Sequence, residues 1–138
     1  MGRREEREER LERVNELIHV IASHGRKFFC YEGITCWLEL DERERLWFVD
    51  SWRGDRTYTH RNGPWSTFHH GGTLKGLVEC FRDFVMFNKQ LSRALFEWPE
   101  WYCRGDLWGY GANMAPVREA ADRLQIVRPP VRGQLEPS

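Results

Sequence analysis

The chain has 138 residues, of which 41% are hydrophobic and 30% are charged, and its 21 Lys and Arg residues equal its 21 Asp and Glu residues in number. This length and balance fit one globular domain and exclude a disordered chain. The zero net charge supplies no overall field for a polyanion, so contact with nucleic acid would need a local basic patch.

The sequence also predicts the compartment. No apolar run reaches the roughly 18 to 20 residues of a membrane span, and the charged first residues lack the apolar stretch of a secretory signal. We therefore expect a cytoplasmic protein that does not bind membranes. Because the four cysteines form no CxxC pair, we expect free thiols, no metal site and no cofactor. The cysteines are Cys30, Cys36, Cys80 and Cys103.

The first predicted element is an amphipathic helix over residues 3–23, because apolar residues recur there at spacings of three and four. Residues 1–10 are mainly Arg and Glu, with favourable i,i+4 pairs such as Glu6 with Arg10. We expect them to form a charged, solvated helical extension, with a coiled-coil or partner-binding arm as the alternative. The apolar stripe consists of Leu11, Val14, Leu17, Ile18 and Ile21.

The next segments predict an antiparallel meander of four to five short strands. The strands are expected over residues 27–31, 34–40, 45–52 and 56–60, with a fifth candidate over 65–69, and short turns rich in Gly, Asp and Asn separate them. Within 34–40, every second residue is apolar, which predicts one face toward the core. That face consists of Ile34, Cys36, Leu38 and Leu40.

Two helices and an irregular segment complete the chain. Thr73 is a suitable N-cap for a long covering helix that ends near residue 88, and Asn113 precedes a short C-terminal helix with Pro116 in its first turn. Residues 91–111 have no helical or strand period and predict an irregular aromatic loop. We therefore predict a single α+β domain over residues 1–126 and a Pro-rich disordered tail over residues 127–138.

The aromatic loop is the first candidate binding site, because large, stiff side chains with polar tips dominate protein interfaces. The same side chains could instead complete the core, since a long irregular loop is usually either functional or tightly packed. Two arginines of the strand turns could supply charged contacts to a partner. The predicted partner-binding residues are Trp98, Trp101, Tyr102, Trp108, Tyr110, Arg53 and Arg56.

A second candidate is the turn that precedes the long helix. Two imidazoles and flexible backbone stand there before a helix N-terminus, where free N–H groups attract anions. A tight connection from a strand to a helix needs the same glycines and Thr cap, and the Lys of a P-loop is absent. The candidate anion-binding residues are His69, His70, Gly71, Gly72 and Thr73.

A third candidate is a set of arginines at strand ends and turns, interleaved with Trp47, Trp52 and Tyr58, which could stack on nucleic-acid bases. Acidic residues such as Asp41 and Glu42 lie among these arginines, so the patch is nearly neutral. The pattern therefore favours salt-bridge partners over a phosphate-binding surface. The arginines are Arg43, Arg45, Arg53, Arg56 and Arg61.

Four blocks carry a resemblance to known proteins: Leu-Trp-Phe-Val-Asp at 46–50, Tyr-Thr-His at 58–60, His-Gly-Gly-Thr-Leu at 70–74 and Gly-Asp-Leu-Trp-Gly-Tyr-Gly at 105–111. Over residues 14–126 the chain resembles small, uncharacterised proteins carried by proteobacterial phages, plasmids and integrative elements. The resemblance transfers no catalytic residue. It implies the setting of a mobile element, whose small accessory proteins include anti-CRISPR proteins and other inhibitors of host defence.

These features favour a non-enzymatic, protein-binding accessory factor of a mobile genetic element, with anti-CRISPR-type inhibition as its candidate activity and a host or element protein, such as a CRISPR effector, as its partner. No residue spacing matches a catalytic motif, and Cys80 with Asp50 and His60 could form a nucleophilic site only in an assumed fold. Two alternatives remain: a nucleic-acid-binding module that uses the strand-turn arginines and aromatics, and a phosphate-handling enzyme built on residues 69–73.

Overall fold

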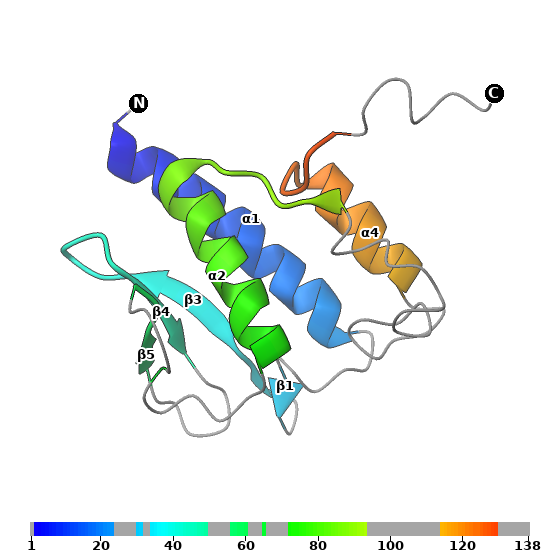
Figure 1. The fold of residues 1–138 in the computed structure, drawn as a ribbon, viewed down its shortest axis with the longest axis horizontal. Helices are drawn as coiled ribbons and strands as arrows, with labels where there is room; N and C mark the ends of the chain where they lie inside the picture. The colour runs from blue at the N-terminus through cyan, green and yellow to red at the C-terminus, as the bar shows by residue number, and fades with distance from the viewer. Residues whose placement is uncertain are drawn as a thin grey trace.

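The structure is a computed structural model that describes residues 2–23, 30–31, 34–49, 56–60, 65, 72–93 and 114–129. The fold is α+β, as predicted (Figure 1). The described helices are α1 (Arg3–Ser23), α2 (Gly72–Phe87) and α4 (Met114–Arg123). The described strands are β1 (Cys30–Tyr31), β2 (Ile34–Thr35), β3 (Trp37–Leu40), β4 (Leu46–Val49) and β5 (Arg56–Tyr58).

The described strands form two separate antiparallel units. Strands β1 and β2 pair as a two-stranded ribbon, and β3, β4 and β5 form a three-stranded sheet in that order. The predicted single meander of four to five strands is not confirmed, because the strand expected over residues 34–40 is interrupted at Cys36. The fifth candidate strand lies outside the described residues except for Trp65, which is buried.

The alternation predicted for residues 34–40 is confirmed from Cys36 onward. Cys36 and Leu38 are 2% and 1% exposed and belong to the core, as expected, and Leu40 packs against its edge. Phe48 of β4 lies opposite Leu38 and is fully buried. A period of two therefore identified the inner face correctly but could not show that the strand changes its pairing partner within that face.

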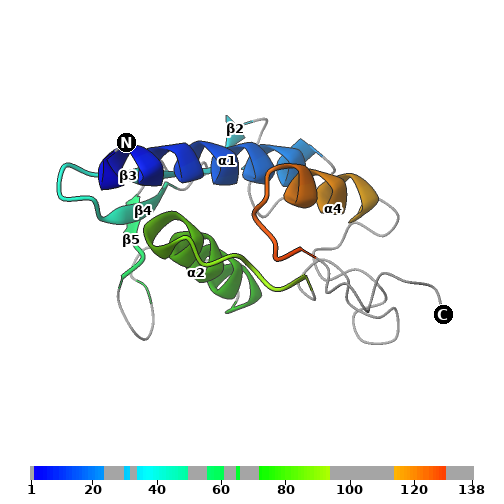
Figure 2. The same cartoon turned by 90° about the horizontal axis from the view of Figure 1, so that it is seen from above.

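Helix α1 is the central element of the fold. It contacts α2, α4 and β3, and Figures 1 and 2 show α2 and α4 flanking it. Four residues of the predicted stripe are fully buried, and burial of each side chain of this size contributes roughly 1.5–3 kcal/mol to folding. They are Val14, Leu17, Ile18 and Ile21.

Two arginines of α1 bind the C-terminal end of α2. The Nε of Arg7 donates to the carbonyl of Met86 at 3.2 Å, and the Nε of Arg10 donates to the carbonyl of Val85 at 3.0 Å. Carbonyls in the last turn of a helix have no partner within the helix and carry a partial negative charge. Guanidinium groups therefore satisfy these carbonyls and anchor α1 to the end of α2.

Asn15 connects α1 to the edge of the sheet. Its Nδ2 donates to the carbonyl of Leu38 at 2.9 Å, and its Oδ1 accepts the backbone N–H of Leu38 at 2.8 Å. A carboxamide has the same donor and acceptor groups as a peptide unit, so Asn15 replaces a neighbouring strand at this position. It thereby covers polar groups that an edge strand would otherwise expose.

We expect Asn15→Ala to destabilise the domain by roughly 2 kcal/mol or more, because it leaves a backbone donor and acceptor of Leu38 without partners. Urea unfolding followed by tryptophan fluorescence measures this change. Glu16→Ala is the matched control, since Glu16 is the next residue of α1 and its ion pair with Arg123 of α4 is half exposed, and its effect should stay within about 0.5 kcal/mol. Equal effects of the two variants would contradict the role of Asn15.

Candidate functional site

The three-stranded sheet turns one face away from the core. The strand register places Glu39, Trp47 and Tyr58 in one cross-strand row, and Trp37 and Arg56 in the neighbouring row with Val49 between them. Trp37 is 41% exposed. We call this surface the outer sheet face, defined by Trp37, Glu39, Trp47, Arg56 and Tyr58 together with Asp41 and Arg45 at the β3–β4 turn.

Aromatic rings and guanidinium groups pack against one another on the outer sheet face. The ring centroids of Trp47 and Tyr58 are 5.2 Å apart, and the rings are tilted by 52°. The Cζ of Arg56 lies 4.4 Å from the Trp47 ring centroid, and the Cζ of Arg45 lies 5.8 Å from Trp47 and 5.9 Å from Tyr58. These are distances at which cations attract aromatic faces, so the cluster is ordered before any partner binds.

Carboxylates neutralise both arginines of this cluster. The Nε of Arg56 lies 2.9 Å from an oxygen of Glu39, and the Nε of Arg45 lies 2.7 Å from an oxygen of Asp41. Partly exposed pairs of this kind contribute little to stability. They do restrict the side-chain rotamers, which reduces the entropy that a binding event would otherwise lose.

Asp41 fixes the geometry of the β3–β4 turn. One carboxylate oxygen accepts the backbone N–H groups of Arg43 and Arg45 at 2.8 and 2.9 Å, and the other accepts the Trp47 indole N–H at 2.8 Å as well as the Arg45 guanidinium. Burial by itself raises the pKa of the Asp41 carboxyl, but these donors together hold that pKa well below its usual range. The ionised carboxylate therefore positions both Trp47 and Arg45.

His60 follows β5 and continues the aromatic row. Its ring centroid lies 5.5 Å from that of Tyr58, and its Nε2 accepts the backbone N–H of Leu46 at 3.0 Å. Burial, followed by the nearby positive charge of Arg82, lowers the pKa of His60. The imidazole is therefore neutral at neutral pH, and the bond to Leu46 assigns its proton to Nδ1.

A cavity of about 460 Å³ opens beside Trp47 at the β3–β4 end of the outer sheet face. Its lining is rich in charge of both signs, because arginines and acidic residues alternate around the turn. The lining residues are Arg4, Glu39, Leu40, Asp41, Glu42, Arg43, Arg45, Trp47 and Arg56.

The structure brings together only part of the sequence-predicted sites. Arg45 and Arg56 lie together on the outer sheet face, and their ion pairs confirm the salt-bridge interpretation for these two arginines. Gly72 and Thr73 begin α2. Sequence reasoning missed Trp37, although the alternation in residues 34–40 had assigned it to the outward face. The predicted site residues that lie outside the described ranges are Trp52, Arg53, Arg61, His69, His70, Gly71, Trp98, Trp101, Tyr102, Trp108 and Tyr110.

The described ranges also limit other kinds of site. Cys36 and Cys80 are free thiols, and burial raises the pKa of the Cys80 thiol. Among the described residues, no group of three His, Cys, Asp or Glu side chains could hold a metal ion. None of the helices in this part of the chain is long and apolar enough to span a membrane.

Residues 4–128 match the model of the YoqU family, so this chain belongs to the YoqU family. One relative is the SPbeta prophage-derived uncharacterized protein YoqU of Bacillus subtilis (strain 168), which is 32% identical over 87 residues. The alignment covers 62% of this chain and 64% of the relative, so the chain spans slightly less than two thirds of that protein. No solved structure matches the chain.

The family assignment agrees with the resemblance to proteins of phages, because this relative is named as a prophage product. The proteobacterial setting that the resemblance implied is not confirmed, since the relative comes from a Bacillus species.

The ionised form of Asp41 should stabilise the domain in a pH-dependent way. Because its pKa is lower in the folded state than in the unfolded state, this contribution is complete above the unfolded value of about 4 and is lost as the pH falls below it. Wild type should therefore exceed Asp41→Asn in free energy of unfolding at pH 7, and the difference should shrink between pH 5 and pH 2. Urea unfolding across this range measures it, with Glu42→Gln as an exposed control. A difference that does not change with pH would contradict the assignment.

Proposed function

We propose that this protein is a non-enzymatic accessory factor of a mobile genetic element and that it binds a host or element protein through the outer sheet face. The observation that carries the proposal is the cluster of Trp47, Tyr58, Arg45 and Arg56 beside the exposed Trp37. Trp, Tyr and Arg are the residues that contribute most to binding at protein interfaces. The prophage origin of the relative supports the mobile-element setting.

The charge pattern favours a protein partner over nucleic acid. Affinity for nucleic acid comes mainly from cations that displace counterions from phosphates. Arg45 and Arg56 are already paired with carboxylates at 2.7 and 2.9 Å. These carboxylates would repel a phosphate backbone. A protein surface with charges of both signs can complement such a face, whereas a polyanion cannot.

The finer proposal is that binding inhibits the partner by covering its working surface, in the manner of an anti-CRISPR protein. Inhibition of this kind requires only affinity and position and needs no catalytic residue. The aromatic residues between 98 and 110 form a second proposed contact region. A phosphate-handling site at residues 69–73 remains the enzymatic alternative, and bound inorganic phosphate would be its first sign.

We expect Trp37→Ala to abolish capture of the partner while leaving the fold intact, because Trp37 is 41% exposed and lies on the outer sheet face. Tagged wild type and variant are used to isolate proteins from a bacterial lysate, with and without nuclease, and retained proteins are quantified by mass spectrometry. Wild type should retain a specific protein in both conditions, and Trp37→Ala should retain at least tenfold less of it. Phe87→Ala is the matched control, because this ring is 67% exposed at the end of α2 and not on the sheet.

Three outcomes would count against this assignment. Retention that disappears with nuclease would favour the nucleic-acid-binding alternative. Equal losses in Trp37→Ala and Phe87→Ala would show that the outer sheet face has no special role. If the captured protein belongs to a CRISPR system, failure of the wild-type chain to reduce interference against a targeted plasmid would reject the inhibitory function.

A further inference from the structure

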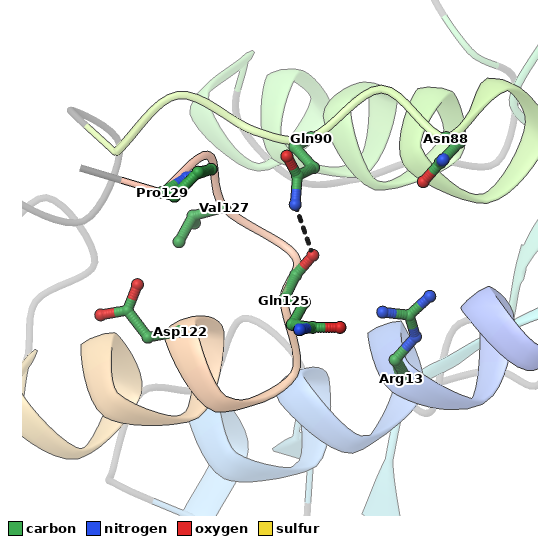
Figure 3. A pocket seen from close by; sticks show the side chains of 7 residues that line it. All are labelled: Arg13, Asn88, Gln90, Asp122, Gln125, Val127 and Pro129. Atoms are coloured by element: carbon green, nitrogen blue, oxygen red, sulfur yellow. Dashed lines mark hydrogen bonds between the residues drawn. The ribbon is translucent and has the colours of Figure 1, made fainter. Parts of the chain in front are cut away.

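A cavity of about 690 Å³ lies between the segments that follow α2 and α4, and it shares no lining residue with the outer sheet face (Figure 3). The two segments run side by side. The backbone N–H of Leu91 donates to the carbonyl of Ile126, and the N–H of Arg128 donates to the carbonyl of Leu91, both at 2.9 Å. These bonds fix the width of the cavity, and Arg13 of α1 closes one side of it.

Both helices end in a residue with left-handed backbone. Asn88 follows α2 with φ of 55°, and Gln125 follows α4 with φ of 57°. At Gln125 the termination is a Schellman motif, in which Gln125 N–H donates to Asp122 and Ile126 N–H donates to Ala121. Glycine is the usual residue at this position because it adopts positive φ without strain, and Asn is tolerated there. Helix termination therefore does not explain the presence of Gln125.

The side-chain amides of these two residues are available for a ligand. Within the described part of the chain, neither the Asn88 nor the Gln125 carboxamide makes a hydrogen bond. Gln90 donates its Nε2 to the Gln125 carbonyl at 3.0 Å, which leaves its Oε1 as an acceptor. Figure 3 shows Asn88 and Arg13 facing each other across a space between the end of α2 and α1, with the Gln125 side chain directed toward Arg13.

The charges around the cavity are already matched. Arg93 binds both carboxylate oxygens of Asp122, at 2.5 and 3.2 Å. Arg13 donates to the Leu124 carbonyl at 3.1 Å and lies 3.6 Å from Glu9. The buried Nε of Arg13 has no acceptor among the described residues. The cavity therefore offers two neutral carboxamides together with one unsatisfied guanidinium N–H.

We propose that this cavity binds a nucleobase, carried either by a free nucleoside or by a nucleic-acid strand. A carboxamide places a donor beside an acceptor, and this pair complements the donor–acceptor edge of a base. Val127 and Pro129 add apolar surface to the lining. The volume lies within the roughly 300–1,000 Å³ of small-molecule sites. This site is separate from the proposed protein-binding face.

The test is an NMR titration of the full chain with adenosine, guanosine, cytidine and thymidine, and with single-stranded oligomers of each base. We expect saturable binding of at least one base. Asn88→Gly and Gln125→Gly should each weaken that binding at least fivefold while the melting temperature stays equal or rises, because glycine suits the positive φ at both positions. Gln125→Glu, which keeps the side-chain shape but replaces the amide donor, should weaken it as well.

Saturation by a nucleoside would identify the free form as a ligand, and saturation only by oligomers would place the base within a strand. The proposal is overturned if no base and no oligomer saturates, or if the three variants bind as tightly as wild type. Trp37→Ala should leave base binding unchanged. Failure of base binding therefore does not bear on the outer sheet face, and failure of partner capture does not bear on this cavity.

Discussion

The hydrogen bonds that α1 makes to backbone groups of its neighbours are the constraint on which the rest of the fold depends. Arg7 and Arg10 bind the last carbonyls of α2, and Arg13 binds the carbonyl of Leu124 just after α4. Asn15 likewise binds the backbone N–H and carbonyl of Leu38 at the edge of β3. Because apolar packing alone is weakly directional, these bonds determine the axial position of each element against α1.

Both proposed binding surfaces follow from this arrangement. Since α1 and α2 cover the inner face of the sheet, the side chains of its other face project away from the core, where Asp41 holds Trp47 and Arg45 in place. Arg7, Arg10 and Arg13 of α1 hold the ends of α2 and α4 near each other. The cavity lined by Asn88 and Gln125 lies between those ends. One helix therefore organises both surfaces, although they share no residue.

The sequence was sufficient for the parts of the fold that depend on periodicity. The stripe of α1 and the inward face of residues 36–40 were predicted correctly, because apolar side chains must leave water at the spacing of their backbone. The interruption at Cys36 was not predictable. Residues 34–35 pair with β1 and residues 37–40 pair with β4, but either pairing gives the same alternation in the sequence. The same limit applies to Arg7 and Arg10, which were expected in a solvated extension. Their contacts join residues more than 70 positions apart, and no local pattern records such contacts.

The proposed binding site was predictable only in part for a related reason. Arg56 was identified from its position at a strand end, and the acidic residues nearby indicated that it would be paired. Trp37 was overlooked because it is a single aromatic residue, whereas several aromatic residues occur together between 98 and 110. Its role in the proposed site depends on the strand register, which places it one row from Glu39 and Trp47. Gln125 likewise could not be singled out from the sequence, because its unusual feature is the positive φ with which it ends α4.

The central functional claim is that the outer sheet face contacts another protein. The most direct measurement is site-specific photocrosslinking in bacterial cells, with a photoreactive phenylalanine derivative introduced in place of Trp37 or, separately, in place of Phe87. The account predicts a discrete covalent adduct with one protein from position 37 and none from position 87. Adducts of equal yield from both positions, or none from position 37, would contradict it.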